Sequence, residues 1–454
     1  MSWGNEPMNL QITARVFSAV LLASCGCRTE SGRFASRSDA ELDLMESTNE
    51  LQNAAFCRGD YRTAETLLSR LAADQTVSSS QYDLEKASIL LVQGRKDEAH
   101  ELLMKARTDI EQVIDSESEE KATSIWHGEN SKVFKGDAHE RATLYALLAI
   151  SFMDRGEYED AIRCVKNGLL ADSANTKEVQ YNSDYALLQY LGYVAASKSG
   201  DVAEATSYAK EMAKSLSGRK IPIGNGSAAR ALFDKANLPD AFVVLWSGLP
   251  PTYVRGGEYE EVRYVSPGNS LVDFLTVESE GGSEQIVAKG LGDVNFQATT
   301  RGGREMDEVL ADKASVKSGF KASGNILIMA GLFCVGTTSD NAIAEVALLS
   351  TGCACLALGG TCHLVGYCIN SKADVRSWRN LPGEFMIVPV KLSGAEKEMT
   401  IRGYRLCDNI ATEKCRVVRA PKGIGVTHLS MLPSEKRGRD VWNADFENFR
   451  KEVK

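Results

Sequence analysis

The stretch Tyr145–Ser173 reads YALLAISFMDRGEYEDAIRCVKNGLLADS and decides the fold of the first half of the chain. Apolar residues recur at helical spacing on both sides of Gly156, which predicts two amphipathic helices. Glycine often ends a helix because it takes the left-handed conformation without a steric penalty. Ala161, five residues later, is small enough for two antiparallel helices to approach closely. The sequence therefore predicts a helical hairpin that turns at Gly156.

The same pattern of a glycine followed by an alanine recurs through residues 46–217. Each copy places the glycine after one predicted helix and the alanine inside the next. The glycines are unevenly spaced, which indicates insertions between the copies. The four pairs are Gly59 and Ala64, Gly94 and Ala99, Gly156 and Ala161, and Gly200 and Ala205.

The pattern resembles the tetratricopeptide repeat, a helix–turn–helix unit of about 34 residues. The third copy fits best, with repeat residues at Tyr145, Leu148, Ala149, Phe152, Gly156, Tyr158 and Ala161. The resemblance implies stacked helix pairs with a concave face for a peptide or a protein. A helical bundle without a binding groove would show the same pattern. Residues 134–141, a polar segment before the third copy, are expected to satisfy helix ends; a ligand-facing rim is the alternative.

Residues 1–24 form a predicted export signal. Val16–Ser24 reads VFSAVLLAS, nine uncharged residues, whereas a helix that spans a bilayer needs about 20 residues. Such a stretch is typical of the apolar core of a signal peptide. The following Leu22-Ala23-Ser24-Cys25 resembles the lipobox of bacterial lipoproteins, which implies a diacylglyceryl group on the Cys25 thiol. Several acyl chains on one residue give stable anchoring.

The surroundings of Cys25 refine this prediction. Translation from Met8 instead of Met1 would give a more conventional leader. Gly26 stands where an aspartate would favour retention in the inner membrane, so the outer membrane, facing the periplasm, is the expected location. Residues 25–45 are polar and predict a tether. The competing interpretation is a buried N-terminal element in which Cys25 is an ordinary thiol.

In the second half of the chain, the sequence pattern of residues 241–432 predicts a β-rich domain. A linker at 218–240 precedes it, and a polar tail at 433–454 follows. Short runs of apolar or alternating residues bounded by turn residues predict its strands. The strand candidates are 242–246, 262–265, 271–277, 284–287, 385–392, 399–406 and 416–419. The predicted fold is thus α+β with several domains.

An apolar insert, residues 324–371, interrupts the β-rich domain. Its part 346–371 contains four cysteines and no Asp, Glu, Lys or Arg. A buried Gly/Cys-rich helical hairpin is the favoured interpretation. Insertion into a membrane is an alternative, because the run is long enough and its small residues would favour helix packing in lipid. A cysteine cluster that binds metal or forms disulfides is the third, although the spacing matches zinc sites poorly.

Two smaller groups of residues are candidate sites. Cys407 and Cys415 flank seven residues that are expected to form a loop, so an oxidising compartment would allow a disulfide between them. Asp374, Arg376 and Trp378 form either a polar anchor on a loop or an ion pair packed on the indole ring.

Charge and motifs exclude several function classes. The formal net charge is −9, which repels phosphate backbones, so nucleic acid is not an expected partner. The five histidines show no metal-binding spacing, and no nucleophile elbow or Walker lysine occurs. Residues 221–228 begin like a dinucleotide fingerprint but follow helices, without the alternating strands of a Rossmann unit. The sequence therefore predicts a protein that is not an enzyme and has no cofactor or metal.

Four stretches carry a resemblance to a family of bacterial lipoproteins with tetratricopeptide-like repeats. They are 134–149, 156–173, 243–261 and 373–385, the last reading ADVRSWRNLPGEF. The resemblance implies a lipoprotein scaffold in the cell envelope that binds an envelope or periplasmic protein, and it supplies no catalytic residues. Two other functions remain open: a structural protein that inserts or oligomerises through 324–371, and a thiol or metal enzyme built from the cysteine cluster.

Overall fold

The computed structural model describes residues 39–73, 78–120, 134–173, 184–218, 238–248, 252–256, 261–265, 274–279, 282–286, 291–300, 327–329, 350–351, 354–356, 358, 376–405 and 408–431. The chain divides into two units, Met1–Ser47 and Thr48–Lys454. The contacts described below lie within the second unit.

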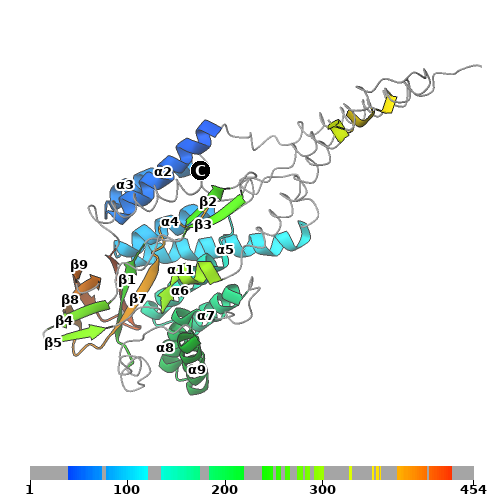
Figure 1. Cartoon of the computed structure of the whole chain (residues 1–454). Helices are drawn as coiled ribbons and strands as arrows, with labels where there is room; N and C mark the ends of the chain where they lie inside the picture. The colour runs from blue at the N-terminus through cyan, green and yellow to red at the C-terminus, as the bar shows by residue number, and fades with distance from the viewer. Residues whose placement is uncertain are drawn as a thin grey trace, which may run out of the picture. The chain divides into compact units, whose positions relative to one another are not determined.

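Paired helices fill the N-terminal half of the described chain (Figure 1). Their bounds are α2 Asp39–Cys57, α3 Tyr61–Ala73, α4 Ser79–Val92, α5 Lys96–Glu120, α6 Ala138–Arg155, α7 Tyr158–Ser173, α8 Ala186–Ser199 and α9 Val202–Gly218. The turns inside the pairs contain Gly59, Gly94, Gly156 and Gly200, whose φ angles are 76°, 77°, 79° and 90°. The alanine that follows each glycine is at most 1% exposed. An N-terminal array of antiparallel helix pairs is therefore what the chain forms.

The described residues of the C-terminal half form two four-stranded sheets and a β-hairpin. The first sheet has the order β10-β1-β7-β6, in which β1 pairs in parallel with β10 and antiparallel with β7. The second sheet is antiparallel, with the order β5-β4-β8-β9, and β2 and β3 form the hairpin. The bounds are β1 Ala241–Ser247, β2 Thr252–Gly256, β3 Glu261–Val265, β4 Phe274–Ser279, β5 Gly282–Ile286, β6 Gly292–Asp293, α11 Val294–Thr300, β7 Glu384–Val390, β8 Glu396–Arg405, β9 Asp408–Val418 and β10 Gly425–Met431.

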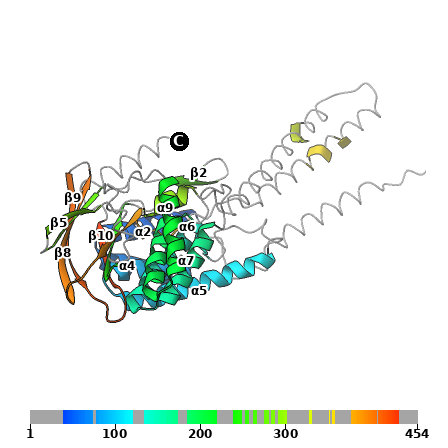
Figure 2. The same cartoon turned by 90° about the horizontal axis from the view of Figure 1, so that it is seen from below.

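The first sheet is the middle layer of three. Successive side chains of a strand point to opposite faces, and every residue of β1 is buried. Phe242, Val244 and Trp246 belong to a hydrophobic cluster that includes the helices. Val243 and Leu245 belong to a second cluster, shared with β4, β8 and β9. Helices thus cover one face of the first sheet and the second sheet covers the other (Figure 1, Figure 2).

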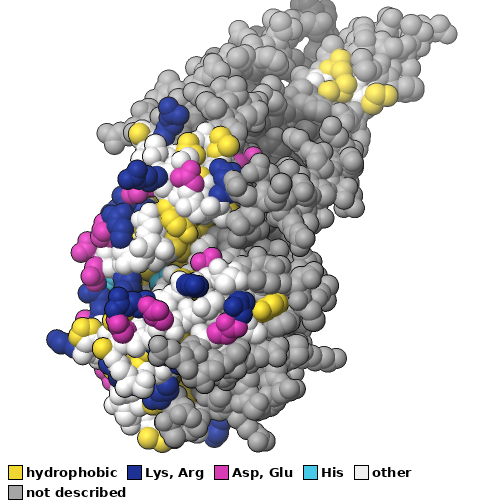
Figure 3. Space-filling view, turned by 90° about the vertical axis from the view of Figure 1, so that its left-hand side faces the viewer, with side chains coloured by type: hydrophobic (Ala, Val, Ile, Leu, Met, Phe, Trp, Pro, Cys, Tyr) yellow, Lys and Arg dark blue, Asp and Glu magenta, His cyan; other side chains and the backbone are white. Residues whose placement is uncertain are grey.

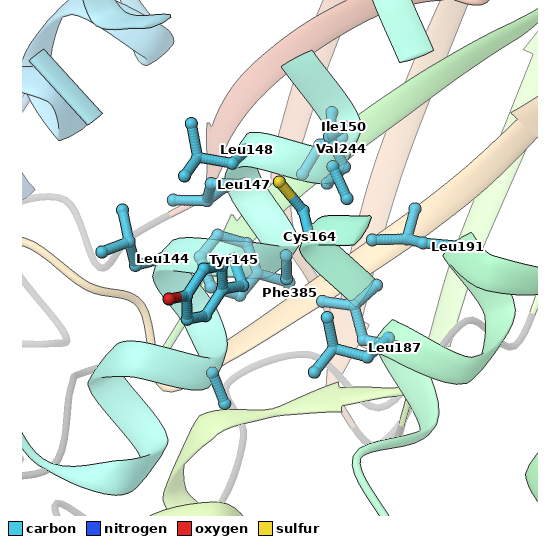
Figure 4. Packing of buried hydrophobic residues seen from close by; sticks show 14 of the residues in the cluster. Leu144, Tyr145, Leu147, Leu148, Ile150, Cys164, Leu187, Leu191, Val244 and Phe385 are labelled. Carbon is cyan, nitrogen blue, oxygen red and sulfur yellow. The ribbon is translucent and has the colours of Figure 1, made fainter. Parts of the chain in front are cut away.

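The helix pairs and the first sheet share one hydrophobic core. In Figure 4, Tyr145 of α6 and Leu187 of α8 lie in the same cluster as Val244 of β1 and Phe385 of β7. The aromatic rings of Trp246 and Phe385 meet edge to face, with centroids 5.0 Å apart, an arrangement that aromatic pairs favour. Unfolding of the sheet would therefore expose one side of the helical array.

The predicted order of helix pairs followed by a β-rich region is confirmed. Each predicted strand overlaps an observed one, while β2, β6 and β10 were not predicted. Helix α2 begins at Asp39, so residues 39–45 of the predicted tether are helical, and their role as a tether stays a prediction. None of the described helices is both long and apolar enough to cross a membrane.

Several predictions fall on residues that the structure does not describe. They are the signal at 1–24 with Cys25, the part of the tether before residue 39, most of the linker, and the tail at 433–454. Of the insert 324–371, the structure describes residues 327–329, 350–351, 354–356 and 358, which are helical. The hairpin predicted for the insert lies outside the described residues.

The segment between Cys407 and Cys415 is a strand, so the loop predicted there was wrong. Residues from Asp408 to Val418 form β9, and Cys415 is a buried free thiol opposite Met399 on β8. Cys407 lies outside the described residues. A strand rises about 3.3 Å per residue, so residues 408 and 415 stand roughly 20 Å apart, whereas a disulfide joins Cα atoms about 6 Å apart. The strand therefore holds these two positions too far apart for the predicted disulfide.

Candidate functional site

Helix α4 carries a buried polar stripe. Gln81, Glu85 and Ser88 are spaced four and three residues apart and therefore share one face of the helix. All three are at most 4% exposed. Buried polar groups need hydrogen-bond partners because an unmatched one is costly to remove from water. The partners come from residues 376–382, Arg-Ser-Trp-Arg-Asn-Leu-Pro, which we name the tryptophan segment.

Glu85 binds the backbone of the tryptophan segment with both carboxylate oxygens. The amide N–H of Arg379 donates to Oε1 at 2.6 Å, and the amide N–H of Asn380 donates to Oε2 at 2.8 Å. The side-chain amide of Asn380 also donates to the Glu85 carbonyl oxygen at 3.2 Å. One residue of α4 thus holds two successive peptide groups and one side chain of the segment.

The other two residues of the stripe bind the segment on either side of Glu85. The side-chain amide of Gln81 donates to the carbonyl oxygen of Ser377 at 3.1 Å. The indole N–H of Trp378 donates to the hydroxyl oxygen of Ser88 at 2.8 Å. Trp378 is 1% exposed, so this bond satisfies a donor that water does not reach.

Helix α6 contributes a second carboxylate. The backbone N–H of Trp378 donates to Oε1 of Glu140 at 2.5 Å, and the backbone N–H of Asp137 donates to Oε2 of the same residue at 2.7 Å. Residues 134–141 were expected either to satisfy helix ends or to face a ligand. Glu140 satisfies the N-terminus of its own helix and also contacts the tryptophan segment.

Helix α2 makes the remaining contacts with the tryptophan segment, through Gln52 and Asn53, which belong to the second unit. The side-chain amide of Gln52 donates to Oδ1 of Asn380 at 3.3 Å, and that of Asn53 donates to the carbonyl oxygen of Arg379 at 2.5 Å. Side chains of α2, α4 and α6 therefore bind five backbone groups of residues 377–380, together with the polar ends of Trp378 and Asn380.

Burial sets the electrostatics of this site. It raises the pKa of Glu85 to about 7, because removal from water disfavours the charged carboxylate more than the two backbone N–H donors and Arg379 favour it. Near neutral pH the carboxylate that holds residues 379 and 380 is therefore close to its titration point.

A second buried contact joins β1 and β10. The indole N–H of Trp246 donates to Nδ1 of His428 at 3.1 Å. Burial lowers the pKa of His428 to about 3, with a further contribution from the charge of Lys96. The neutral imidazole therefore accepts the hydrogen bond from the indole N–H throughout the physiological pH range.

A third contact lies at the turn between α6 and α7, on which the segment before β10 packs. The backbone N–H of Ile424 donates to the carbonyl oxygen of Met153 at 2.8 Å, and that of Val426 donates to Asp154 at 3.0 Å. A side chain at Gly156 would place its Cβ 2.5 Å from the carbonyl oxygen of Lys422. The segment between β9 and β10 thus packs directly on the glycine turn.

The predicted site residues are spread over the chain. The repeat glycines and alanines form the hairpin turns, and Tyr158 opens α7 as a half-buried residue. Trp378 is buried and Arg376 is half-buried, both in the tryptophan segment, whereas Asp374 lies outside the described residues. Nothing in the structure therefore tests the ion pair predicted for Asp374 and Arg376.

The residues that hold the tryptophan segment were missed from the sequence. A weak signal was present, because Gln81, Glu85 and Ser88 share one face of α4, but the helix contains four other polar residues, Ser79, Ser80, Asp83 and Lys86. An isolated stripe of this kind is more often a solvated surface, and only the fold shows that it is buried. Glu140 lies in the polar segment 134–141, for which a ligand-facing rim was one expectation, whereas Gln52 and Asn53 give no such signal.

The thiols that the structure describes are mostly unsuited to nucleophilic chemistry. Burial raises the pKa of Cys57 to about 12 and the pKa values of Cys164 and Cys415 to about 11. Thiols with such values are protonated at neutral pH and react weakly. Of the four cysteines in the apolar insert, the structure describes Cys355.

On the face of the molecule in Figure 3, basic and acidic side chains of the described residues are interspersed, with small hydrophobic areas between them. Among the described residues, no three histidine, cysteine, aspartate or glutamate side chains are grouped so that they could hold a metal ion. The chain matches no protein-family model, no curated protein and no solved structure.

Proposed function

We propose that this protein is a non-catalytic scaffold that binds another protein in the bacterial cell envelope and is anchored to the membrane through a lipid on Cys25. The observation that carries the proposal is the polar face of α2, α4 and α6, which already holds a turn of polypeptide, residues 377–380, by its backbone. Helical repeats commonly use such faces to bind protein segments.

The buried ionisable groups of this region serve contacts between chain segments. Glu85 and Glu140 hold the tryptophan segment, and His428 accepts a hydrogen bond from a buried indole N–H. Each of these groups makes at least one hydrogen bond to another segment of the chain. This arrangement supports binding and assembly as the role of the described region.

The anchor rests on the sequence Leu22-Ala23-Ser24-Cys25 after an apolar stretch. Small residues before the cysteine suit the signal peptidase, and acyl chains on one residue would hold the protein on the envelope. Gly26 favours the outer membrane, with the folded part in the periplasm and an envelope or periplasmic protein as the partner.

Metabolic labelling with a radioactive or clickable fatty acid tests the anchor. The wild-type chain should incorporate the label and sediment with membranes. The Cys25→Ala variant should incorporate none, while Cys27→Ala, two residues away, should label normally. Equal labelling of the two variants, or a wild-type protein that stays unlabelled, would refute the anchor.

Crosslinking in living cells, followed by mass spectrometry, tests the scaffold. A photoreactive residue in place of Asn53 of α2, which is half-buried on the polar face, should capture a defined envelope protein. The same residue in place of the exposed Glu101 on α5 serves as the control. Capture of identical proteins from both positions would indicate nonspecific contact and count against a binding face at this location.

A further inference from the structure

We infer that the face of α2, α4 and α6 is a recognition site for a peptide that turns after a tryptophan and carries an asparagine two residues later, and that the tryptophan segment is its intramolecular occupant. The inference rests on the proposed scaffold function and names the chemistry of the partner.

The backbone contacts are those of peptide recognition. Side-chain acceptors of Glu85 and Glu140 receive the N–H groups of three successive residues, from Trp378 to Asn380. Side-chain donors of Gln81 and Asn53 reach the carbonyl groups of residues 377 and 379. Backbone groups of a folded chain mostly bond to other backbone groups. Here the segment turns at Arg379 and Asn380, with the N–H of Leu381 donating to the carbonyl oxygen of Trp378 at 3.4 Å, and side chains of the helices bind other backbone groups of this turn.

The side-chain contacts define the sequence of the peptide. The indole N–H of Trp378 has its acceptor on Ser88, and the indole is buried. The amide of Asn380 is matched at both ends, because Gln52 donates to its oxygen and the Glu85 carbonyl accepts from its nitrogen. Arg379 between them is half-buried. Tryptophan and asparagine are therefore selected, and the charge of Glu85 also favours a cation between them.

The internal occupant does not satisfy the site completely. Oε1 of Gln81 and Oγ of Ser377 are buried without a hydrogen-bond partner. A peptide that offers a donor to Gln81 at this position would make one bond more than the internal segment makes. An occupant that leaves buried polar atoms unmatched can be displaced by one that matches them.

The test uses the full-length protein and a fluorescent peptide with the sequence of residues 373–385. The double variant Trp378→Ala, Asn380→Ala weakens the binding of the internal segment to the face and leaves the amino-acid sequence of the helices unchanged. Fluorescence anisotropy should show the peptide binding to this variant at least tenfold more tightly than to the wild type, because the tethered segment competes at high effective concentration. A control peptide with alanine at both positions should bind to neither protein.

Two further substitutions in the double variant locate the site. Ser88→Ala removes the acceptor of the indole N–H and should weaken peptide binding about tenfold, because a buried donor then lacks a partner. Ser69→Ala, on the exposed side of α3, should leave binding unchanged.

The inference is overturned if the double variant keeps its helical circular dichroism and binds no peptide, or binds both peptides equally. If the double variant unfolds, the assay is repeated with Asn380→Ala alone. Unfolding of that variant too would also overturn the inference, because a face that exists only with its own segment in place recognises nothing else. Fatty-acid labelling and capture in cells are measured independently, so a negative peptide assay leaves the anchor and the scaffold standing.

Discussion

Glu85 is an ionisable residue in a place where water does not stabilise its charge. Its pKa is about 7 in the folded protein, against an ordinary value of 4.5. Below pH 4.5 the group is protonated in both the folded and the unfolded state. Between pH 4.5 and 7 the unfolded chain loses the proton first, so the folded state loses relative stability as the pH rises.

The contribution of Glu85 to the free energy of unfolding should therefore fall by on the order of 3 kcal/mol between pH 4.5 and 7. Urea unfolding at a series of pH values measures it as the difference between the wild type and Glu85→Gln, which cannot ionise. Glu101→Gln, at an exposed position on α5, should leave the pH profile as it is in the wild type. A difference between the wild type and Glu85→Gln that stays constant with pH would show that Glu85 does not titrate in this range.

His428 has the opposite pH dependence. Burial lowers its pKa from 6.5 to about 3, so the stability it contributes is present above pH 6.5 and is lost as the pH falls toward 3. His428→Asn keeps an acceptor for the indole N–H of Trp246 and removes the titration. Unfolding measured between pH 7 and 4 should show a smaller loss of stability in this variant than in the wild type. The half-buried His100, whose pKa burial also lowers, should give a weaker effect in His100→Asn, and equal slopes in all three proteins would contradict the assignment.

At the scale of elements, two helix turns with the same backbone conformation meet different surroundings. Gly94 and Gly156 have φ angles of 77° and 79°. A Cβ at Gly94 would meet nothing within 4 Å, whereas at Gly156 it would lie 2.5 Å from the carbonyl oxygen of Lys422. The sequence marks both glycines in the same way, and only the position of the segment before β10 distinguishes them.

The two turns therefore respond differently to alanine. Gly94→Ala should lower the free energy of unfolding by about 1 kcal/mol, the cost of a left-handed residue with a side chain. Gly156→Ala should cost a further 1–3 kcal/mol, roughly, because backbone must move to make room. Chemical denaturation measures both. Equal losses in the two variants would mean that the segment before β10 yields without resistance.

Strand β10 shows why one element escaped prediction. Its residues His428 and Ser430 are polar although they lie toward the helices, where they bind Trp246 and Tyr61. An alternating pattern of apolar residues is the sequence signal for a half-buried strand. Here two positions of that pattern hold polar residues whose partners lie more than 180 residues away in the sequence, so the pattern is broken.

At the scale of the whole molecule, the shared core predicts that helices and sheets unfold together. Trp246 of β1 lies in contact with Phe56 of α2 and Phe385 of β7, with ring centroids 6.3 Å and 5.0 Å apart. Trp246→Ala should therefore cost about 3–5 kcal/mol. The helical signal in circular dichroism and the signal of the sheets in infrared spectra should shift to lower denaturant by the same amount. If the helical signal kept its midpoint while the sheet signal shifted, the two regions would fold separately.

The sequence by itself determined the elements whose signals are local. Glycine turns, small alanines and apolar residues at helical spacing predicted the helix pairs, because these preferences act between neighbours along the chain. Runs of apolar residues predicted most strands for the same reason. Trp378 lies in a distinctive stretch of sequence, residues 373–385, but neither the burial of its side chain nor its hydrogen-bond partner could be predicted from that stretch.

The tertiary structure alone decided which faces meet. The contacts of Glu85 with residues 379 and 380, of Glu140 with residue 378, and of Gly156 with residue 422 join positions more than 200 residues apart. No local preference encodes these pairings, because each depends on the order of the strands and on how the first sheet lies against the helices. A buried carboxylate and an exposed one are the same letter in the sequence, and only the packed fold removes water from one of them.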